Sequence, residues 1–161
     1  TRLLVRFSAP SFGTPDLAAL VRRELAAHGV PGERLWMEAP EAKVFTHLRN
    51  AQQFLEAVAP LGCRVGLEQF GSGLDSFQLL THFKPAFVKI DPGLTDEIGK
   101  PGEAQEKVRE ITARAREEGI TTLAAQVDDA QAMSQLFSAG VDFVSGDFVA
   151  PVGAQMNFEF G

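Results

Sequence analysis

The sequence is short of several features that would each have defined a class of protein. It has a single cysteine, Cys63, so no disulfide can form within it, and a reducing compartment such as the cytoplasm is expected. No apolar run is long enough to span a membrane, and no basic-then-apolar leader opens the chain, so membrane insertion is not expected. Positive charge is scarce too. The net charge of −6 at pH 7 argues against a general nucleic-acid binder, but it permits a small anionic ligand held by one or two local cations.

What is present fits one soluble domain. The 161 residues are 45% hydrophobic and 22% charged, which is enough apolar material for a sizeable core. Short runs rich in Val, Ile, Leu and Phe predict strands at 2–8, 34–38, 64–68, 86–90, 120–125 and 141–145. Helical patterns between them predict helices at 14–29, 47–62, 103–119 and 128–140, with another beginning after the Gly-rich turn at 70–73. This alternation predicts an α/β fold whose parallel strands are joined by right-handed crossovers.

Each predicted strand ends in polar or charged residues. These are Arg6, Glu38, Glu68 with Gln69, Lys89 with Asp91, Gln126, and Ser145 with Asp147. In parallel sheets and barrels the carboxyl ends of the strands converge on the ligand site, so these residues are candidates for one. Strand ends also turn polar simply because they meet solvent, and spacing alone leaves both interpretations open.

Six blocks of this sequence resemble, in order, the motifs of the EAL domain family, the cyclic-di-GMP phosphodiesterases and their inactive relatives. The blocks are VRFS (5–8), RLWMEAPEA (34–42), LEQFGSGLDSF (67–77), FVKID (87–91), LAAQVDD (123–129) and GVDFVSGDFVAP (140–151). The resemblance implies a TIM-like (β/α)8 barrel of EAL type, of which this chain has only about six strand–helix units. Residues 1–161 are therefore expected to be a partial EAL-like domain, with the first strands and the Glu-Ala-Leu motif lying outside the chain. A six-stranded piece would have unpaired edges.

The same resemblance implies a site that has lost its catalytic ligands. Active members hold two metal ions through carboxylates and an amide, whereas this chain has Arg6 for the amide, Glu68 and Gln69 for two aspartates, Ala125 for a glutamate and Ser145 for a glutamine. Glu38, Glu41 and Lys89 match the family. Arg6 is the decisive change, because a guanidinium has only donors and its charge repels a divalent ion. We therefore expect no phosphodiesterase activity and no catalytic or metal-binding residues.

A site of this composition suits a bis-phosphate nucleotide better than hydrolysis. Arg6 and Lys89 can contact phosphate, as can backbone N–H groups of the 70–73 turn. Polar side chains at the strand ends can bind guanine or ribose, and Phe148 and Pro151 can pack on a base. The predicted ligand-binding residues are Arg6, Glu38, Glu68, Gln69, Lys89, Gln126, Asp147, Phe148 and Pro151. Structural alternatives remain: Lys89 as an ion-pair partner of Glu38 or Glu68, Phe148 as core, and Glu41 as the organiser of a loop.

Among inactive EAL proteins the pattern is most similar to the FimX type of cyclic-di-GMP receptor. That resemblance implies cyclic-di-GMP as the ligand, no required cofactor, a PilZ-domain protein as partner, and a role in type IV pilus biogenesis and twitching motility. One alternative is a protein-interaction scaffold that no longer binds nucleotide, in which Arg6 would be neutralised by Glu38 and Glu68. A further alternative is a weak metal-dependent phosphodiesterase.

Overall fold

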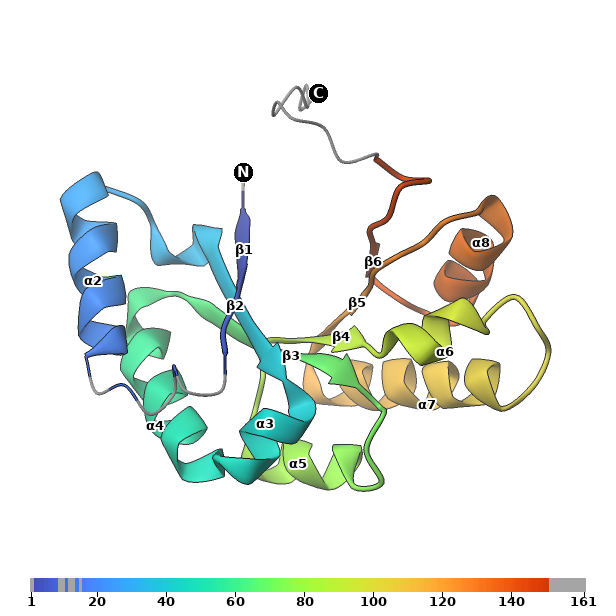
Figure 1. Cartoon of the computed structure of the whole chain (residues 1–161), viewed down its shortest axis with the longest axis horizontal. Coiled ribbons are helices and arrows are strands. Elements are labelled where there is room, and N and C mark those ends of the chain that lie inside the picture. Colours follow the sequence, from blue (N-terminus) through green and yellow to red (C-terminus); the bar gives the residue numbers. More distant parts are fainter. Residues whose placement is uncertain (1, 9–10, 12–13, 15, 151–161) are drawn as a thin grey trace.

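A computed structural model describes residues 2–8, 11, 14 and 16–150 of the chain. Its six strands form one sheet in sequence order, and every neighbouring pair is parallel, as the sequence predicts. The strands are β1 (Leu3–Arg6), β2 (Leu35–Pro40), β3 (Arg64–Phe70), β4 (Phe87–Ile90), β5 (Thr121–Ala124) and β6 (Phe143–Val144). Because the sheet curls, it forms part of a TIM-like barrel wall, with the helices on its outer face (Figure 1).

The helices connect successive strands. They are α2 (Leu17–His28), α3 (Glu41–Thr46), α4 (Leu48–Val58), α5 (Ser76–His82), α6 (Pro92–Asp96), α7 (Glu103–Glu118) and α8 (Ala130–Ser138), with single 3-10 turns at Gly32–Arg34 and Ala59–Leu61. The predicted helix at 14–29 begins three residues later than expected, after Asp16. The predicted helix at 47–62 ends at Val58 and continues as a 3-10 turn. Helices α3 and α6 are additional to those that the sequence patterns predict.

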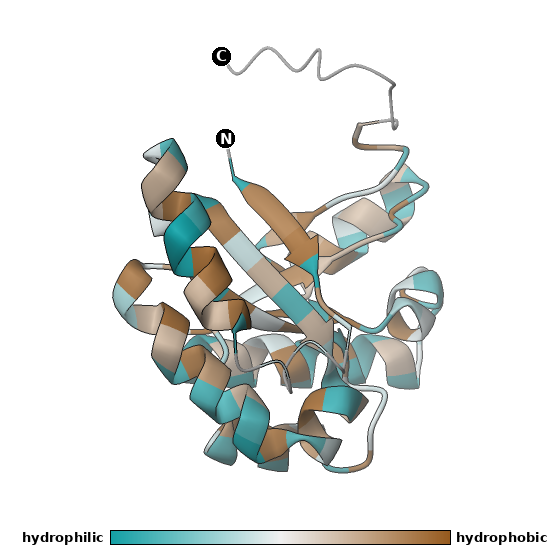
Figure 2. Ribbon diagram, turned by 60° about the vertical axis from the view of Figure 1, so that its left-hand side comes forward, coloured by the Kyte–Doolittle hydropathy of each residue, from teal (hydrophilic) through white to brown (hydrophobic). Residues whose placement is uncertain are grey.

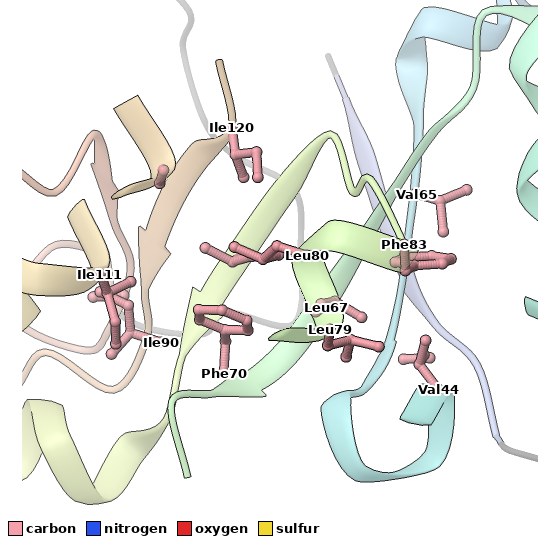
Figure 3. Packing of buried hydrophobic residues seen from close by; sticks show 14 of the residues in the cluster. Val44, Val65, Leu67, Phe70, Leu79, Leu80, Phe83, Ile90, Ile111 and Ile120 are labelled. Carbon is pink, nitrogen blue, oxygen red and sulfur yellow. The ribbon is translucent and has the colours of Figure 1, made fainter. Parts of the chain in front are cut away.

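The hydrophobic core lies between the outer face of the sheet and the helices. Leu67 and Phe70 of β3 and Ile90 of β4 pack against Leu80 of α5 and Ile111 of α7, all at 1% exposure or less (Figure 3). Burying one such side chain stabilises the fold by about 1.5–3 kcal/mol. Cys63 belongs to the same cluster, and its burial raises the pKa of the thiol above the ordinary value.

Side chains at the amino ends of the strands close one end of the barrel interior. The rings of Trp36 and Phe87 stack with centroids 4.9 Å apart, and the guanidinium groups of Arg2 and Arg64 lie 5.4 and 5.3 Å from the indole ring. Gly66 of β3 leaves space for this stack, because a Cβ there would lie 2.4 Å from the Phe87 ring.

Strands β1 and β6 form the edges of the described sheet. Leu3 and Leu4 of β1 are 59% and 41% exposed, and Phe143 of β6 is 50% exposed. Figure 2 colours most of the β1 ribbon as hydrophobic. Among the described residues, every helix is too short or too polar to cross a lipid bilayer.

Candidate functional site

Four of the predicted site residues form a charged cluster at the carboxyl ends of β1 to β4. Side chains alternate between the two faces of a strand, so Val5, Met37 and Leu67 face the helices while their neighbours Arg6, Glu38 and Glu68 face the interior. Register brings the strands together here, with Arg6 opposite Glu38 and Pro40 opposite Glu68. The sheet thus gathers side chains that are far apart in sequence onto one mouth, as the siting rule for parallel strands predicts.

The cluster contains two acids and two bases in contact. Lys89 Nζ is in short contact with Glu38 Oε1 and lies 3.6 Å from Glu68 Oε2, while Arg6 Nε makes a short ion pair with Glu68 Oε1. Glu38 and Glu68 are 3% and 4% exposed. The Lys89 side chain is 21% exposed and that of Arg6 is 62% exposed. The buried acids are therefore neutralised as a group, and Arg6 is the member that solvent or a ligand reaches most easily.

Two carboxylate oxygens of this cluster keep unused hydrogen-bonding capacity. Glu38 Oε2 and Glu68 Oε1 are buried, and neither has a hydrogen-bond partner among the described residues, although Glu68 Oε1 has the charge of Arg6 beside it. Buried acceptors without a donor are costly, by about 1–3 kcal/mol each. Glu68 Oε1 is occupied by Arg6, so Glu38 Oε2 is the atom that favours a ligand bringing a hydrogen-bond donor.

Glu41, the first residue of α3, holds the Gly-rich loop that follows β3. Its Oε2 accepts from the Gly71 N–H at 2.9 Å, and its Oε1 accepts from Ser76 Oγ at 2.6 Å. Position 73 leaves no room for a side chain, since a Cβ there would lie 2.6 Å from Glu41 Oε1. The prediction that Glu41 organises a loop is confirmed. The expectation of free phosphate-binding N–H groups in the 70–73 turn is wrong for Gly71, whose N–H is already bonded.

Two predicted site residues, Gln69 and Gln126, have left-handed backbones. Their φ angles are 55° and 61°, in a region of backbone conformation that residues other than glycine seldom adopt. Both are exposed and lie at the carboxyl ends of β3 and β5. In a strand, Gln69 would face opposite to its neighbour Glu68, which lies in the charged cluster. Non-glycine residues held in this region concentrate at functional sites.

A cavity of about 660 Å³ opens at the carboxyl ends of β5 and β6. Its lining residues come from α6 and from the segments that follow the two strands: Asp96, Ala125, Gln126, Asp128, Ser145, Gly146, Asp147 and Ala150. The lining has three carboxylates and neither lysine nor arginine. Gly146 lets two lining segments of the cavity pack closely together, because a Cβ at this position would lie 2.3 Å from the Val127 backbone. The cavity therefore suits groups that donate hydrogen bonds.

The cavity adjoins the barrel interior. Ala125 and Ser145 line both the cavity and a second pocket of about 300 Å³, which extends along the interior to Lys89 and to Trp36. Lys89 is the member of the charged cluster that lines this second pocket. The charged cluster and the cavity are thus two parts of one mouth.

The structure places the remaining predicted residues less centrally. Phe148 is 47% exposed, so the alternative that it belongs to the core is wrong. Its N–H donates to the Val127 carbonyl. Pro151 lies outside the described residues. Sequence reasoning missed Asp96 and Asp128 as cavity residues. Asp128 lies two residues after Gln126 in a quoted motif and could have been found, whereas Asp96 lies on the five-residue helix α6.

Comparison with known proteins decides the family. A family profile described as the EAL domain matches residues 1–152. The chain belongs to the EAL domain family. The EAL domain of Xanthomonas citri FimX, solved in complex with c-diGMP, is 63% identical and superposes with a TM-score of 0.95 over 100% of this chain and 64% of that one. The Pseudomonas aeruginosa FimX EAL domain, solved bound to c-di-GMP, is 27% identical, with a TM-score of 0.93 over 100% of this chain and 66% of that one.

The curated relatives are longer proteins. Signaling protein YkoW of Bacillus subtilis is 26% identical over 144 residues, which is 89% of this chain and 18% of YkoW. This EAL chain thus spans less than a fifth of YkoW and about two thirds of the two FimX EAL structures. The predicted similarity to EAL domains, and to FimX among them, is confirmed.

The residues of this EAL mouth do not fit the two metal ions that the family resemblance implies. Each buried carboxylate already faces a side-chain cation, Lys89 for Glu38 and Arg6 for Glu68. Divalent ions of this kind need several oxygen ligands, and at the positions concerned Arg6 and Ala125 offer none. In the part of the chain that the structure describes, no three His, Cys, Asp or Glu side chains are grouped so that they could hold a metal.

Proposed function

We propose that this EAL domain is a receptor that binds cyclic-di-GMP without hydrolysing it. The observation that carries the proposal is the cluster of Arg6, Glu38, Glu68 and Lys89, in which side-chain cations stand beside the buried carboxylates. Two-metal hydrolysis of a phosphodiester needs metal ions to activate water and to clamp the leaving oxygen. A guanidinium and an ammonium can bind and orient phosphate, but they cannot generate a metal-bound nucleophile.

The two parts of the mouth suit the two chemical parts of the ligand. Arg6 pairs with Glu68 through Nε and is more than half exposed, so its terminal nitrogens can form a forked contact with a phosphate. Gln126, Asp128 and Asp147 in the acidic cavity can accept from the N–H groups on the edge of a guanine. Phe148, and Pro151 beyond the described residues, can pack on a base. Complexes of c-di-GMP with two similar FimX EAL domains support this assignment.

Titration calorimetry of cyclic-di-GMP into the complete domain tests the proposal, first with EDTA and then with Mn²⁺. We expect equal affinity in both conditions and recovery of intact dinucleotide. Arg6→Gln should weaken binding by roughly 10- to 100-fold, corresponding to about 1.5–3 kcal/mol for a charged hydrogen bond. Arg22→Gln, at an exposed position of α2 outside the sheet, is the control for loss of an arginine and should bind like wild type. Binding that requires Mn²⁺, together with a linear product, would establish the weak enzyme instead.

A protein-interaction scaffold is the second candidate, and one observation favours it. The guanidinium of Arg6 is already neutralised by Glu68, which is the arrangement expected if no phosphate binds there. Absence of calorimetric binding both with EDTA and with Mn²⁺ would select this function. Arg6 would then serve only to balance the charge of a buried acid.

We propose further that the domain acts in the cytoplasm and signals to the type IV pilus and twitching machinery through a PilZ-domain protein. Its similarity to FimX EAL domains is the support for this assignment. Co-elution of the complete domain with a purified PilZ-domain protein, measured with and without cyclic-di-GMP, is the direct test. No complex in either condition would remove this partner while leaving the nucleotide proposal intact.

A further inference from the structure

The charge balance of the cluster of Arg6, Glu38, Glu68 and Lys89 depends on two cations. Glu38 and Glu68 contribute two negative charges, and Lys89 contributes one positive charge that both acids share. Arg6 supplies the second positive charge through its contact with Glu68 Oε1. Without Arg6, two buried carboxylates would face one ammonium, and Glu68 Oε1 would lose its only nearby cation.

Arg6 differs from Lys89 in how it is held. The Lys89 side chain is mostly enclosed between the two acids, whereas that of Arg6 is 62% exposed and reaches the cluster from β1 at the edge of the sheet. Lysine also matches the family at position 89, so an ammonium there is compatible with metal-binding relatives. The charge that is peculiar to this mouth is the guanidinium at position 6, where the family resemblance implies an amide.

We infer that Arg6 is the residue that excludes divalent cations from this mouth, by occupying with its own charge the side of Glu68 that a metal would need. A dication beside the Glu68 carboxylate would lie within a few ångströms of the guanidinium, and like charges at that separation repel each other even where solvent partly screens them. Replacing Arg6 removes that repulsion and frees Glu68 Oε1 from its ion pair. The inference deepens the proposed receptor function, on which its biological meaning rests, but it makes a claim about Mn²⁺ alone.

The test is direct binding of Mn²⁺ to the complete domain without nucleotide, with free Mn²⁺ followed by electron paramagnetic resonance. Wild type should show only weak binding. Arg6→Asn, which puts an amide oxygen next to the two acids, should lower the apparent Kd for Mn²⁺ by roughly tenfold or more. Arg6→Lys keeps the charge and should behave like wild type. Arg22→Asn, at an exposed position of α2, is the control for loss of an arginine and should also leave Mn²⁺ binding unchanged.

Circular dichroism and thermal unfolding establish that each variant is folded, and Arg6→Gln serves as a second neutral variant if Arg6→Asn is unstable. The inference is overturned if wild type binds Mn²⁺ as tightly as the neutral variants, or if folded neutral variants gain no binding. It is also overturned if Arg6→Lys gains as much as Arg6→Asn, because exclusion would then not depend on charge. Since nucleotide is absent, failure of the receptor proposal in calorimetry would leave this result unaffected, and the reverse also holds.

Discussion

Gln126 has a backbone conformation that its side chain makes unfavourable. The left-handed region costs a residue with a Cβ about 1 kcal/mol or more, whereas glycine enters it freely. Glutamine at position 126 therefore lowers the stability slightly, but it places a polar side chain in the lining of the acidic cavity. We interpret this as a residue retained for the ligand.

Substitution of Gln126 by glycine should separate stability from binding. Relief of the left-handed strain offsets the added freedom of the unfolded chain, so Gln126→Gly should change the free energy of unfolding by less than about 0.5 kcal/mol. Gln53→Gly, at an exposed position inside α4, should cost about 1 kcal/mol. Urea denaturation measures both values. Calorimetry should show weaker cyclic-di-GMP binding only for Gln126→Gly; equal destabilisation of the two variants would argue against the left-handed conformation.

At the scale of elements, Glu41 joins α3 to the loop between β3 and α5. The two elements are far apart in sequence, and one buried carboxylate holds them through Gly71 and Ser76. This loop begins after Phe70, the residue that follows Glu68 and Gln69 in β3. The position of two mouth residues therefore depends on a side chain that lies outside the charged cluster.

Glu41→Gln should loosen this loop. The amide has the same size but lacks the charge and has one acceptor oxygen fewer, so about 1–3 kcal/mol of stability should be lost. Hydrogen exchange of the Gly71 amide, now bonded to Glu41 Oε2, should accelerate. Glu56→Gln, on the exposed side of α4, is the control and should stay within about 0.5 kcal/mol of wild type. Unchanged exchange at Gly71 would show that the loop holds its shape without Glu41.

How far the sequence predicts these elements depends on their length and surroundings. All six strands overlap the apolar runs that predict them; β2 to β5 are apolar because helices cover them, whereas β1 and β6 expose apolar side chains at the sheet edges. Helices α3 and α6 have six and five residues, too few for a periodic pattern to be distinguished. Arg6, Glu38, Glu68 and Lys89 were predictable as strand ends. Their ion pairs, the left-handed glutamines and the place of Asp96 depend on tertiary packing, which the sequence patterns do not contain.

At the scale of the whole molecule, the two edges of the sheet, β1 and β6, determine how the chain can associate. Leu3 and Leu4 on β1 and Phe143 on β6 expose apolar surface beside unpaired backbone groups. Exposed apolar edges of this kind pair with further strands, either in the same protein or in another copy. The barrel architecture of the EAL family provides such strands.

Residues 1–161 produced alone should therefore self-associate. Sedimentation velocity should show a mass that rises with concentration, and the dye ANS should bind to the open edge. Leu3→Lys should reduce the association, because a charge at an edge opposes strand pairing. Leu74→Lys, at a fully exposed leucine in the loop between β3 and α5, should not. A concentration-independent monomer would contradict this expectation and indicate that the edges are adequately protected.

The stack at the closed end of the interior has a spectroscopic consequence. The chain has one tryptophan and no tyrosine, so its emission under selective excitation comes from Trp36 alone. That indole is 7% exposed, stacks on the Phe87 ring at an interplanar angle of 28° and is flanked by two guanidinium groups. It also lines the pocket that reaches Lys89. The fold thus carries an intrinsic fluorophore inside the strand bundle, on the same strand as Glu38, whose emission reports on the packing of the interior and on changes that reach this pocket.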